Sequence, residues 1–190
     1  MDFEQSLQQT LTIFTRLEEI RSEIDAAGDL ILKTLQRGNK IITCGNGGSA
    51  AEAQHLMTEL VGRYKGNRIS LPAVALTSDG TLMSCIGNDY GWDQVFVRQL
   101  EGLARPGDLL VCLSSSGQSD DLVAVLEAAR DKGIESLSLL GKGGGACKGL
   151  ATVDVIIPSD QTAPVQEAHL FLIHHFCERI EEAFPADPKM

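Results

Sequence analysis

The sequence predicts an α/β protein in which a five-stranded parallel sheet is flanked by helices, with a helical extension before the first strand. Three observations support this fold class. From Lys40 onward, short apolar runs alternate with amphipathic helical stretches. The runs are apolar at nearly every position, which is typical of parallel strands covered by helices on both faces. Two of the runs lead into glycine- and serine-rich turns that open a helix, as happens at the carboxyl edge of a parallel sheet.

The length of the chain sets the expected domain organisation. With 190 residues, the chain can bury one core well and is short for two domains. We therefore expect a single domain over residues 1–190, with helices over residues 1–37 and an α/β core over residues 38–184. The composition, 43% apolar and 22% charged, is that of an ordinary globular protein.

The segment before the first strand contains one or two expected helices. Apolar residues at spacings of three and four form a stripe from Phe3 to Leu17, and an apolar pattern continues from Ile20 to Leu35 with Gly28 as a candidate break. Two interpretations are open. The helices pack against the sheet, or they form an oligomer-forming pair.

The α/β core is expected to contain five strands and five helices in alternation. The expected strands are residues 40–45, 72–76, 108–114, 135–141 and 153–158. The expected helices are residues 50–63, 81–86, 92–104, 119–133 and 162–184.

Charge and cysteine content narrow the class of protein. A formal net charge of −10 disfavours non-specific nucleic-acid binding, so an anionic ligand must be held by local donors and backbone dipoles. The five cysteines are scattered and form no CxxC pair, which indicates reduced thiols in a cytosolic protein. No unbroken apolar run reaches eighteen residues, so we expect no membrane span and a cytoplasmic location. Charged residues precede any long apolar run, which argues against a secretory signal.

The first glycine-rich turn is Asn46-Gly47-Gly48-Ser49, called turn one below. It leaves an expected strand and enters an expected helix. Its glycines let a ligand approach the backbone, and the free N–H groups at the helix start attract anions. Ser49 is a candidate cap of that helix. The alternative is a tight strand–helix turn that binds nothing.

The second turn, Ser114-Ser115-Ser116-Gly117-Gln118-Ser119, is called turn two below, and it also joins a strand to a helix. One hydroxyl would be enough to cap a helix, so four of them suggest that phosphate oxygens are bound here. Both turns should lie at the carboxyl edge of the sheet, although they need not be neighbours.

Two groups of polar side chains are candidate chemical groups. His55 and Glu59 are four residues apart on one helix and share a face, so they suit a divalent metal such as zinc or form a surface pair. Gln166 and His174 lie on the last helix, eight positions apart, which places them about 80° and roughly 12 Å apart on an ideal helix. Either that helix starts irregularly, or the two groups serve a site built from more than one subunit.

Six segments together make the chain recognisable. They are CGNGGSAAEAQH, GRY, IGNDYG, SSSGQS, the GKGGG turn and VQEAHLFLIHH. The chain resembles the sugar isomerase, or SIS, family and, within it, the phosphoheptose isomerases, over nearly its whole length. The resemblance implies a flavodoxin- or Rossmann-like three-layer fold and a homotetramer with active sites between subunits.

The resemblance also implies a set of site residues. The substrate pocket would be lined by Asn46, Gly47, Gly48, Ser49, Glu59, Asn88, Asp89, Ser114, Ser115, Ser116, Ser119 and Gln166. One zinc ion per subunit would be held by His55, Glu59, Gln166 and His174. The positions of Glu59 and His174 are those assigned the proton transfers, and whether Glu59 acts as base, ligand or both stays open.

The implied reaction converts sedoheptulose 7-phosphate to D-glycero-D-manno-heptose 7-phosphate through an enediol, early in the synthesis of nucleotide-activated heptose for lipopolysaccharide or other glycans. Two positions depart from the family pattern. Glu52 replaces a common Asp, and Pro164 replaces a common Arg, which removes a cation. The alternatives are a non-catalytic relative that binds the bacterial replication initiator, a sugar-phosphate sensor, or an isomerase of aminosugar or arabinose phosphates. The full set of His55, Glu59, Gln166 and His174 favours the heptose isomerase.

Overall fold

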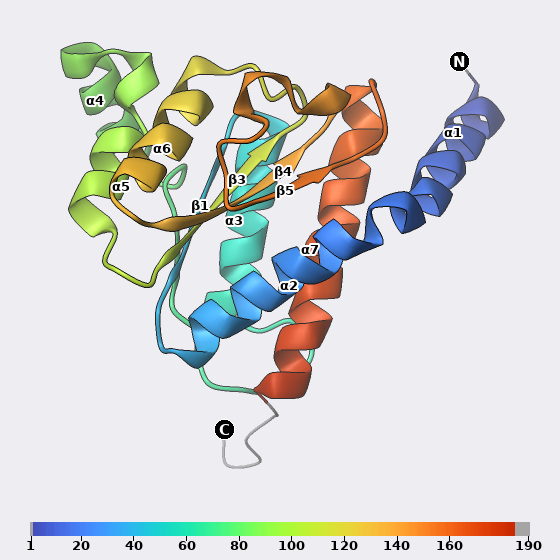
Figure 1. Ribbon diagram of the computed structural model, residues 1–190, viewed down its shortest axis with the longest axis horizontal. Coiled ribbons are helices and arrows are strands. Elements are labelled where there is room, and N and C mark those ends of the chain that lie inside the picture. Colours follow the sequence, from blue (N-terminus) through green and yellow to red (C-terminus); the bar gives the residue numbers. More distant parts are fainter. Residues whose placement is uncertain (1, 185–190) are drawn as a thin grey trace.

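The computed structural model describes residues 2–184, and these form an open parallel sheet between two layers of helices (Figure 1). The sheet has five strands, all parallel to their neighbours. This confirms the predicted fold class. The strands are β1 (Ile41–Gly45), β2 (Ala73–Ala75), β3 (Leu109–Ser114), β4 (Glu135–Leu140) and β5 (Val153–Ile156).

The strand order β2-β1-β3-β4-β5 brings the two glycine-rich turns together. The order reverses between β1 and β3, and ligands of open α/β sheets bind at such a switch point. Gly45 at the end of β1 pairs with Leu113 near the end of β3, so turn one and turn two leave neighbouring strands at the same edge. The sequence had left this adjacency open.

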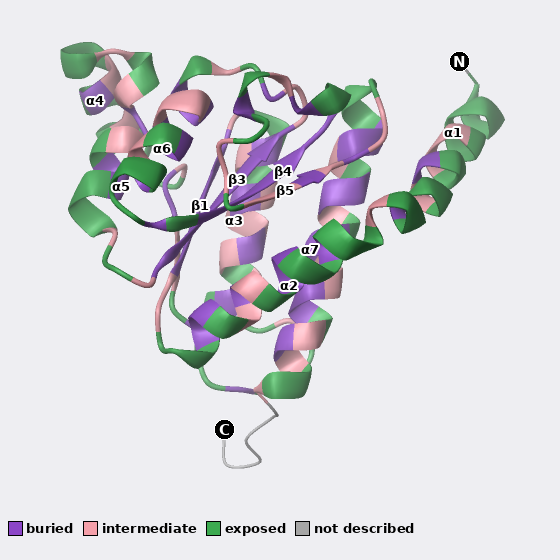
Figure 2. Cartoon of the chain, viewed as in Figure 1, coloured by how far each residue is buried: buried purple, intermediate pink, exposed green. Residues whose placement is uncertain are grey.

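Two layers of helices cover the two faces of the sheet (Figure 2). The side chains of each strand alternate between two apolar clusters, one containing Ile41 and Val111 and the other containing Ile42 and Cys112. The first face is covered by α2 (Arg21–Gln36), α3 (Gly48–Val61) and α7 (Thr162–Ala183). The second face is covered by α4 (Gly80–Tyr90), α5 (Val97–Leu103) and α6 (Asp120–Asp131).

The N-terminal segment breaks at a different place from the one expected. Helix α1 (Phe3–Arg16) is followed by a 3-10 turn at Leu17–Ile20, and α2 then continues without interruption through Gly28. The candidate break at Gly28 is therefore wrong. A Cβ atom at Gly28 would lie 2.1 Å from Nη1 of Arg179, so the glycine lets the Arg179 side chain of α7 cross α2.

The two N-terminal helices differ in how they pack. Helix α2 packs against β5 and α7, whereas α1 extends away from the body of the protein along the start of α7 (Figure 1). The hydroxyl of Thr10 donates to Glu167 at 2.7 Å, but Phe3 is 82% and Leu11 51% exposed. Packing against the sheet therefore accounts for α2 and leaves most of the α1 stripe uncovered in one chain.

Two expected helices have different bounds in the structure. The short helix expected at 81–86 runs from Gly80 to Tyr90, because the Asp79 carboxylate caps it by accepting from the Leu82 backbone N–H. The helix expected at 92–104 divides into a 3-10 turn at Trp92–Gln94 and α5.

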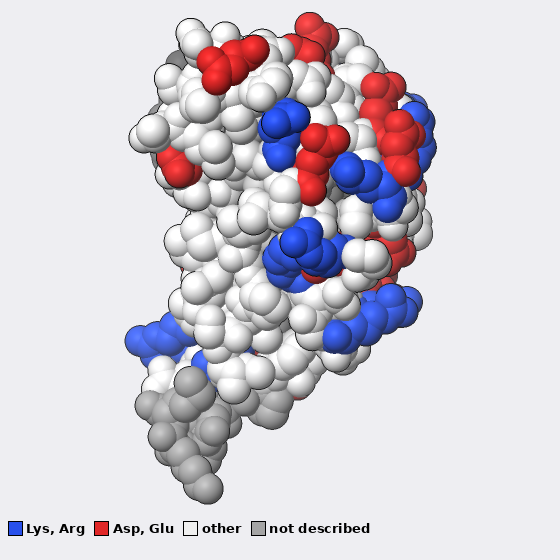
Figure 3. All heavy atoms as spheres, turned by 90° about the vertical axis from the view of Figure 1, so that its left-hand side faces the viewer, with Lys and Arg blue, Asp and Glu red and all other residues white. Residues whose placement is uncertain are grey.

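The surface shows no feature that departs from the charge expectations. On the α4–α5 side, Lys and Arg side chains are interspersed with Asp and Glu among broad uncharged areas, and no continuous basic area appears on this face (Figure 3). Within residues 2–184, no helix combines the length and apolar character that crossing a membrane requires.

Candidate functional site

Turn one is built so that α3 begins against α7. Gly47 adopts a φ of 56°, which favours glycine, and precedes the first residue of α3. The predicted cap at Ser49 is wrong, because Gly47 occupies the cap position and Ser49 is already helical. The buried Ser49 hydroxyl instead accepts from Nε2 of Gln166 at 3.3 Å. A Cβ atom at Gly48 would lie 2.5 Å from the same Nε2, so glycine is needed for this contact.

Turn two uses two of its four hydroxyls to hold its own shape. The Ser114 hydroxyl accepts from the Gly117 backbone N–H at 2.9 Å, and that of Ser116 accepts from the Gln118 N–H at 3.3 Å. Ser119 precedes α6 as its cap residue without a side-chain capping bond. Within the described part of the chain, the hydroxyls of Ser115 and Ser119 have no hydrogen-bond partner, so they are free to bind a ligand.

The GKGGG segment braces turn two from the next strand along. Gly117 has a φ of 62°, and a Cβ atom there would lie 1.9 Å from the carbonyl oxygen of Gly144. The carbonyl oxygen of Gly117 in turn accepts from the Cys147 backbone N–H at 2.9 Å. This close backbone contact explains why glycine occupies both positions.

A carboxylate that sequence reasoning missed joins the two turns. Nδ2 of Asn46 in turn one donates to both carboxylate oxygens of Asp121 on α6, at 3.0 and 2.9 Å. Burial raises the pKa of the Asp121 carboxyl, and the hydrogen bonds from Asn46 and from the Leu122 backbone oppose that shift. The available signal was an acid two residues beyond a hydroxyl-rich turn, but only the strand order shows what it reaches.

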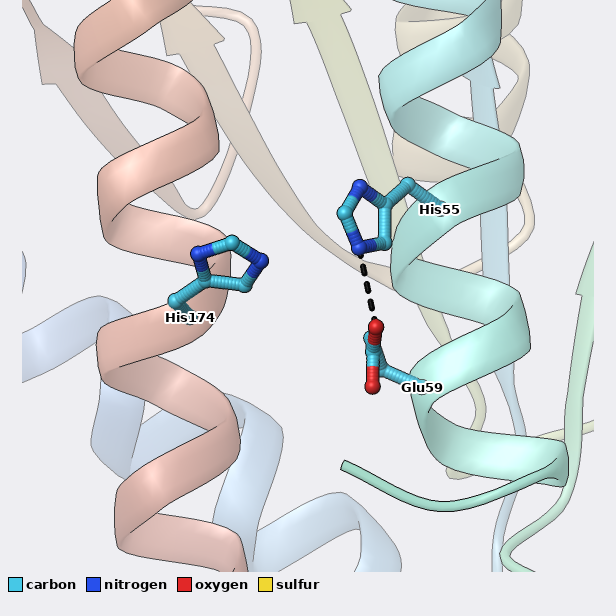
Figure 4. Close-up of side chains that lie close together, drawn as sticks. All are labelled: His55, Glu59 and His174. Carbon is cyan, nitrogen blue, oxygen red and sulfur yellow. Dashed lines mark hydrogen bonds and ion pairs between the residues drawn. The ribbon is translucent and has the colours of Figure 1, made fainter. Parts of the chain in front are cut away.

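Below the two turns, α3 and α7 bring together His55, Glu59 and His174, called the His–Glu–His group (Figure 4). Nε2 of His55 lies 2.9 Å from Oε1 of Glu59, and one ligand atom from each of the three side chains lies within 4.8 Å of the others. Ligand atoms around one tetrahedral zinc ion lie roughly 3 to 4 Å apart, so these two nitrogens and one oxygen fit zinc after a small closure.

Residues around the group hold it in place. Tyr64 follows α3 and stacks on the His174 ring with centroids 5.6 Å apart. The guanidinium of Arg68 is buried and donates to the backbone carbonyl oxygens of Glu59 and Leu60 at the end of α3. Cys177, one turn further along α7, is no nucleophile at neutral pH, because burial raises the pKa of its thiol to about 12.

Gln166 is separate from the His–Glu–His group within one chain. It contacts Ser49 near the start of α7, and α7 is a continuous α-helix from Thr162. An irregular helix start, one of the two expected explanations, is therefore wrong. The other explanation, a site shared between subunits, stays a prediction.

The remaining predicted residues have other surroundings. Asn88 and Asp89 lie on exposed α4, where Nδ2 of Asn88 donates to Asp89 at 2.8 Å, and no hydrogen bond within residues 2–184 joins them to either turn. Pro164 is buried in the first turn of α7, where proline is accommodated. Glu52 faces buried His169, with Oε2 and Nδ1 3.8 Å apart.

Comparison with known proteins identifies the family. A model described as the SIS domain matches residues 3–141, and the chain belongs to that family. Phosphoheptose isomerases from Akkermansia muciniphila and Campylobacter concisus are 48% and 44% identical to it, covering 88% and 90% of this chain and 89% and 90% of their own. Within the SIS family, the chain therefore belongs with the phosphoheptose isomerases.

Solved structures agree with this assignment. A phosphoheptose isomerase from Neisseria gonorrhoeae superposes with a TM-score of 0.87 at 36% identity, and one from Francisella tularensis with a TM-score of 0.90 at 29% identity. Each alignment covers 94% of this chain and 96% of the other. The predicted membership and fold are confirmed.

Proposed function

We propose that the protein is an aldose–ketose isomerase that converts sedoheptulose 7-phosphate to D-glycero-D-manno-heptose 7-phosphate through an enediol. The observation that carries this proposal is the His–Glu–His group, which two helices assemble below a pair of anion-binding turns. The named relatives support the same reaction. The complete group also favours the enzyme over a non-catalytic initiator-binding relative or a sensor.

Phosphate binding is assigned to the two turns. The start of α6 offers backbone N–H groups together with the free hydroxyls of Ser115 and Ser119, and a helix N-terminus favours an anion. Ser49 and Gln166 add polar groups from the neighbouring turn. The proposal also includes Asn46, Gly47, Gly48, Asn88, Asp89, Ser114 and Ser116 as lining residues.

Proton transfer is assigned to Glu59 and His174. In the forward direction a base removes a proton from C1 of the ketose, and a proton is returned to C2, while the hydroxyl proton moves from O1 to O2. A carboxylate within hydrogen-bond reach of carbon-bound hydrogen can act as the base, and an imidazole can exchange protons with the two oxygens. Glu59 is 18% exposed and the His55 ring contacts it, so a ligand can reach the carboxylate.

A zinc ion is the proposed cofactor, one per subunit. His55, Glu59 and His174 would hold it, with Gln166 as the fourth ligand in a site shared between subunits. When bound, the ion would supply Lewis-acid polarisation of the substrate's carbonyl oxygen.

The proposed assembly is a homotetramer with its active sites between subunits. The exposed apolar stripe of α1 supports it, since Phe3, Leu7 and Leu11 are left uncovered in one chain. Residues 1–37 would then serve oligomerisation and residues 38–184 would form the catalytic core. We further propose a cytoplasmic location and a role early in heptose activation for lipopolysaccharide or related glycans.

The test is a coupled assay of the purified protein with sedoheptulose 7-phosphate, with and without a chelator. Turnover that the chelator removes and added zinc restores is expected. A protein without turnover that instead binds the replication initiator tightly would contradict the proposal and favour the non-catalytic alternative.

A further inference from the structure

The side chain of Asn46 is held from below by a buried carboxylate. Asp121 is 3% exposed, and its two oxygens both lie within 3.0 Å of Nδ2 of Asn46. Oδ1 of Asp121 also accepts from the Leu122 backbone N–H at 3.0 Å. Asp121 is thus fixed to the first turn of α6, and Asn46 is fixed to Asp121 across the switch point between β1 and β3.

This contact determines which end of the Asn46 amide faces the ligand. An ionised carboxylate can only accept hydrogen bonds, so it must face the NH₂ end of the amide. The carbonyl oxygen then points away from Asp121. Within residues 2–184, no group donates to Oδ1 of Asn46, and the half-buried side chain lines a pocket of about 480 Å³ with Trp92 and Ser119. The group on offer to a ligand is an acceptor.

The charges around this pocket favour a hydrogen-bond donor as well. Its lining includes the carboxylates of Asp93, Asp120 and Asp121 and no Lys or Arg. Carboxylates this close repel a phosphate dianion and attract hydroxyl hydrogens. Phosphate is better served by the free hydroxyls of Ser115 and Ser119 and by the N–H groups at the start of α6.

We infer that Asp121 is a positioning residue that turns the Asn46 carbonyl oxygen toward the ligand, so that Asn46 selects a sugar hydroxyl and leaves the phosphate to turn two. The inference rests on the proposed function, because it concerns how the same phosphosugar is oriented. Asp121 acts through Asn46 and does not itself contact the reacting carbons.

The test compares two ligands on matched variants by titration calorimetry. Asp121→Asn can present its own NH₂ group to Asn46 and release the amide orientation, so sedoheptulose 7-phosphate should bind about tenfold more weakly. Inorganic phosphate should bind as tightly as before or up to about threefold more tightly, since a nearby negative charge is lost. The control Asp120→Asn removes the same charge from the same turn of α6 and should leave the ratio of the two affinities within about twofold.

A reciprocal exchange protects the test against a folding defect. Asn46→Asp combined with Asp121→Asn again pairs one amide with one carboxylate and again offers an acceptor oxygen to the ligand. This double variant should regain at least about threefold of the lost sugar-phosphate affinity. In steady-state assays, Asp121→Asn should raise KM about tenfold and change kcat by less than about threefold.

The outcomes separate the possible errors. Equal losses for both ligands in Asp121→Asn, or no loss for either, would overturn the inference while the proposed function stands, and so would an exchange variant that regains nothing. Wild-type protein that binds inorganic phosphate but gains no affinity from the attached seven-carbon sugar would overturn the proposed function together with this inference.

Discussion

Helices α3 and α7 face each other at two levels that carry different chemistry. At the carboxyl edge of the sheet their contact is neutral, an amide and a hydroxyl from Gln166 and Ser49. About two turns further along α7, the facing side chains are His174 on one helix and His55 and Glu59 on the other. Neutral donors and helix N–H groups suit a bound phosphate, whereas titratable groups suit proton transfer. One helix pair can therefore separate binding from chemistry.

Removing the titratable groups should have the largest effect. Glu59→Gln keeps the shape of the side chain but loses the base, and His174→Ala removes the facing imidazole, so each should lower kcat by about 10² to 10⁴-fold. The oligomer should stay intact in both. Neighbouring His175→Ala and surface Glu127→Gln serve as controls in the coupled assay. Near-normal turnover in either site variant would contradict the assignment of the lower level.

The support of the lower level can be tested through Arg68. Its buried guanidinium bonds the Glu59 and Leu60 carbonyls at the end of α3, and Arg68→Ala leaves them without that cation, which should cost about 3 kcal/mol of unfolding free energy. Ser70→Ala removes only the bond to the Val61 carbonyl at the same helix end and should cost about 1 kcal/mol. Urea unfolding measures both, and equal costs would show that the guanidinium has no special part.

The opposite edge of the sheet offers a contrast without function. Burial tends to raise the pKa of Asp108, but hydrogen bonds from the Lys40 side chain and from the Lys40 and Arg105 backbones lower it overall. The stabilisation is present above the ordinary Asp pKa, near about 3.9, and is lost as the pH falls through the lower pKa of the folded protein.

Asp108→Asn should therefore lose about 2 kcal/mol of stability at pH 7, and the loss should shrink toward pH 3. Because Asp108 lies away from both levels, kcat and KM at neutral pH should not change. Thermal unfolding across pH and a parallel assay check the two statements. A change in kcat with unchanged stability would show that this edge of the sheet takes part in the reaction.

The smallest effect is expected at the upper level. Gly48→Ala places a methyl group about where Nε2 of Gln166 now lies, so Gln166 must move and KM should rise about tenfold while kcat changes less. Gly102→Ala on α5 is the control, since a Cβ atom there meets nothing within 4 Å. A drop in kcat without a change in KM would mean that this level also contributes to chemistry.

The sequence predicted the elements that depend on local pattern and missed those that depend on tertiary contact. Apolar alternation located all five strands, and the glycine-rich turns fell at the edge that parallel strands impose. The position of Gly28 looked like a helix break because local pattern cannot show that Arg179 crosses there. The link from Asn46 to Asp121 exists only because β1 and β3 are neighbours, a strand order that spacing does not reveal.

The candidate site divides in the same way. His55 and Glu59 were predictable as a pair from their spacing on one helix, but their meeting with His174 required the packing of α3 on α7. Ser49 was expected to cap α3, yet the turn places Gly47 at the cap and frees the hydroxyl for Gln166. Tyr64 and Arg68 gave no spacing signal, since they lie in the irregular segment after α3.

The most direct test of the division between binding and chemistry follows one carbon-bound proton. Wild-type protein and Glu59→Gln are incubated with sedoheptulose 7-phosphate in D₂O, and NMR measures deuterium at C1 of the ketose and C2 of the aldose while calorimetry measures substrate affinity. We expect deuterium uptake with the wild type and at least about a hundredfold slower uptake with Glu59→Gln at an affinity within about threefold. Isomerisation without deuterium uptake, or equal uptake by both proteins, would contradict the account.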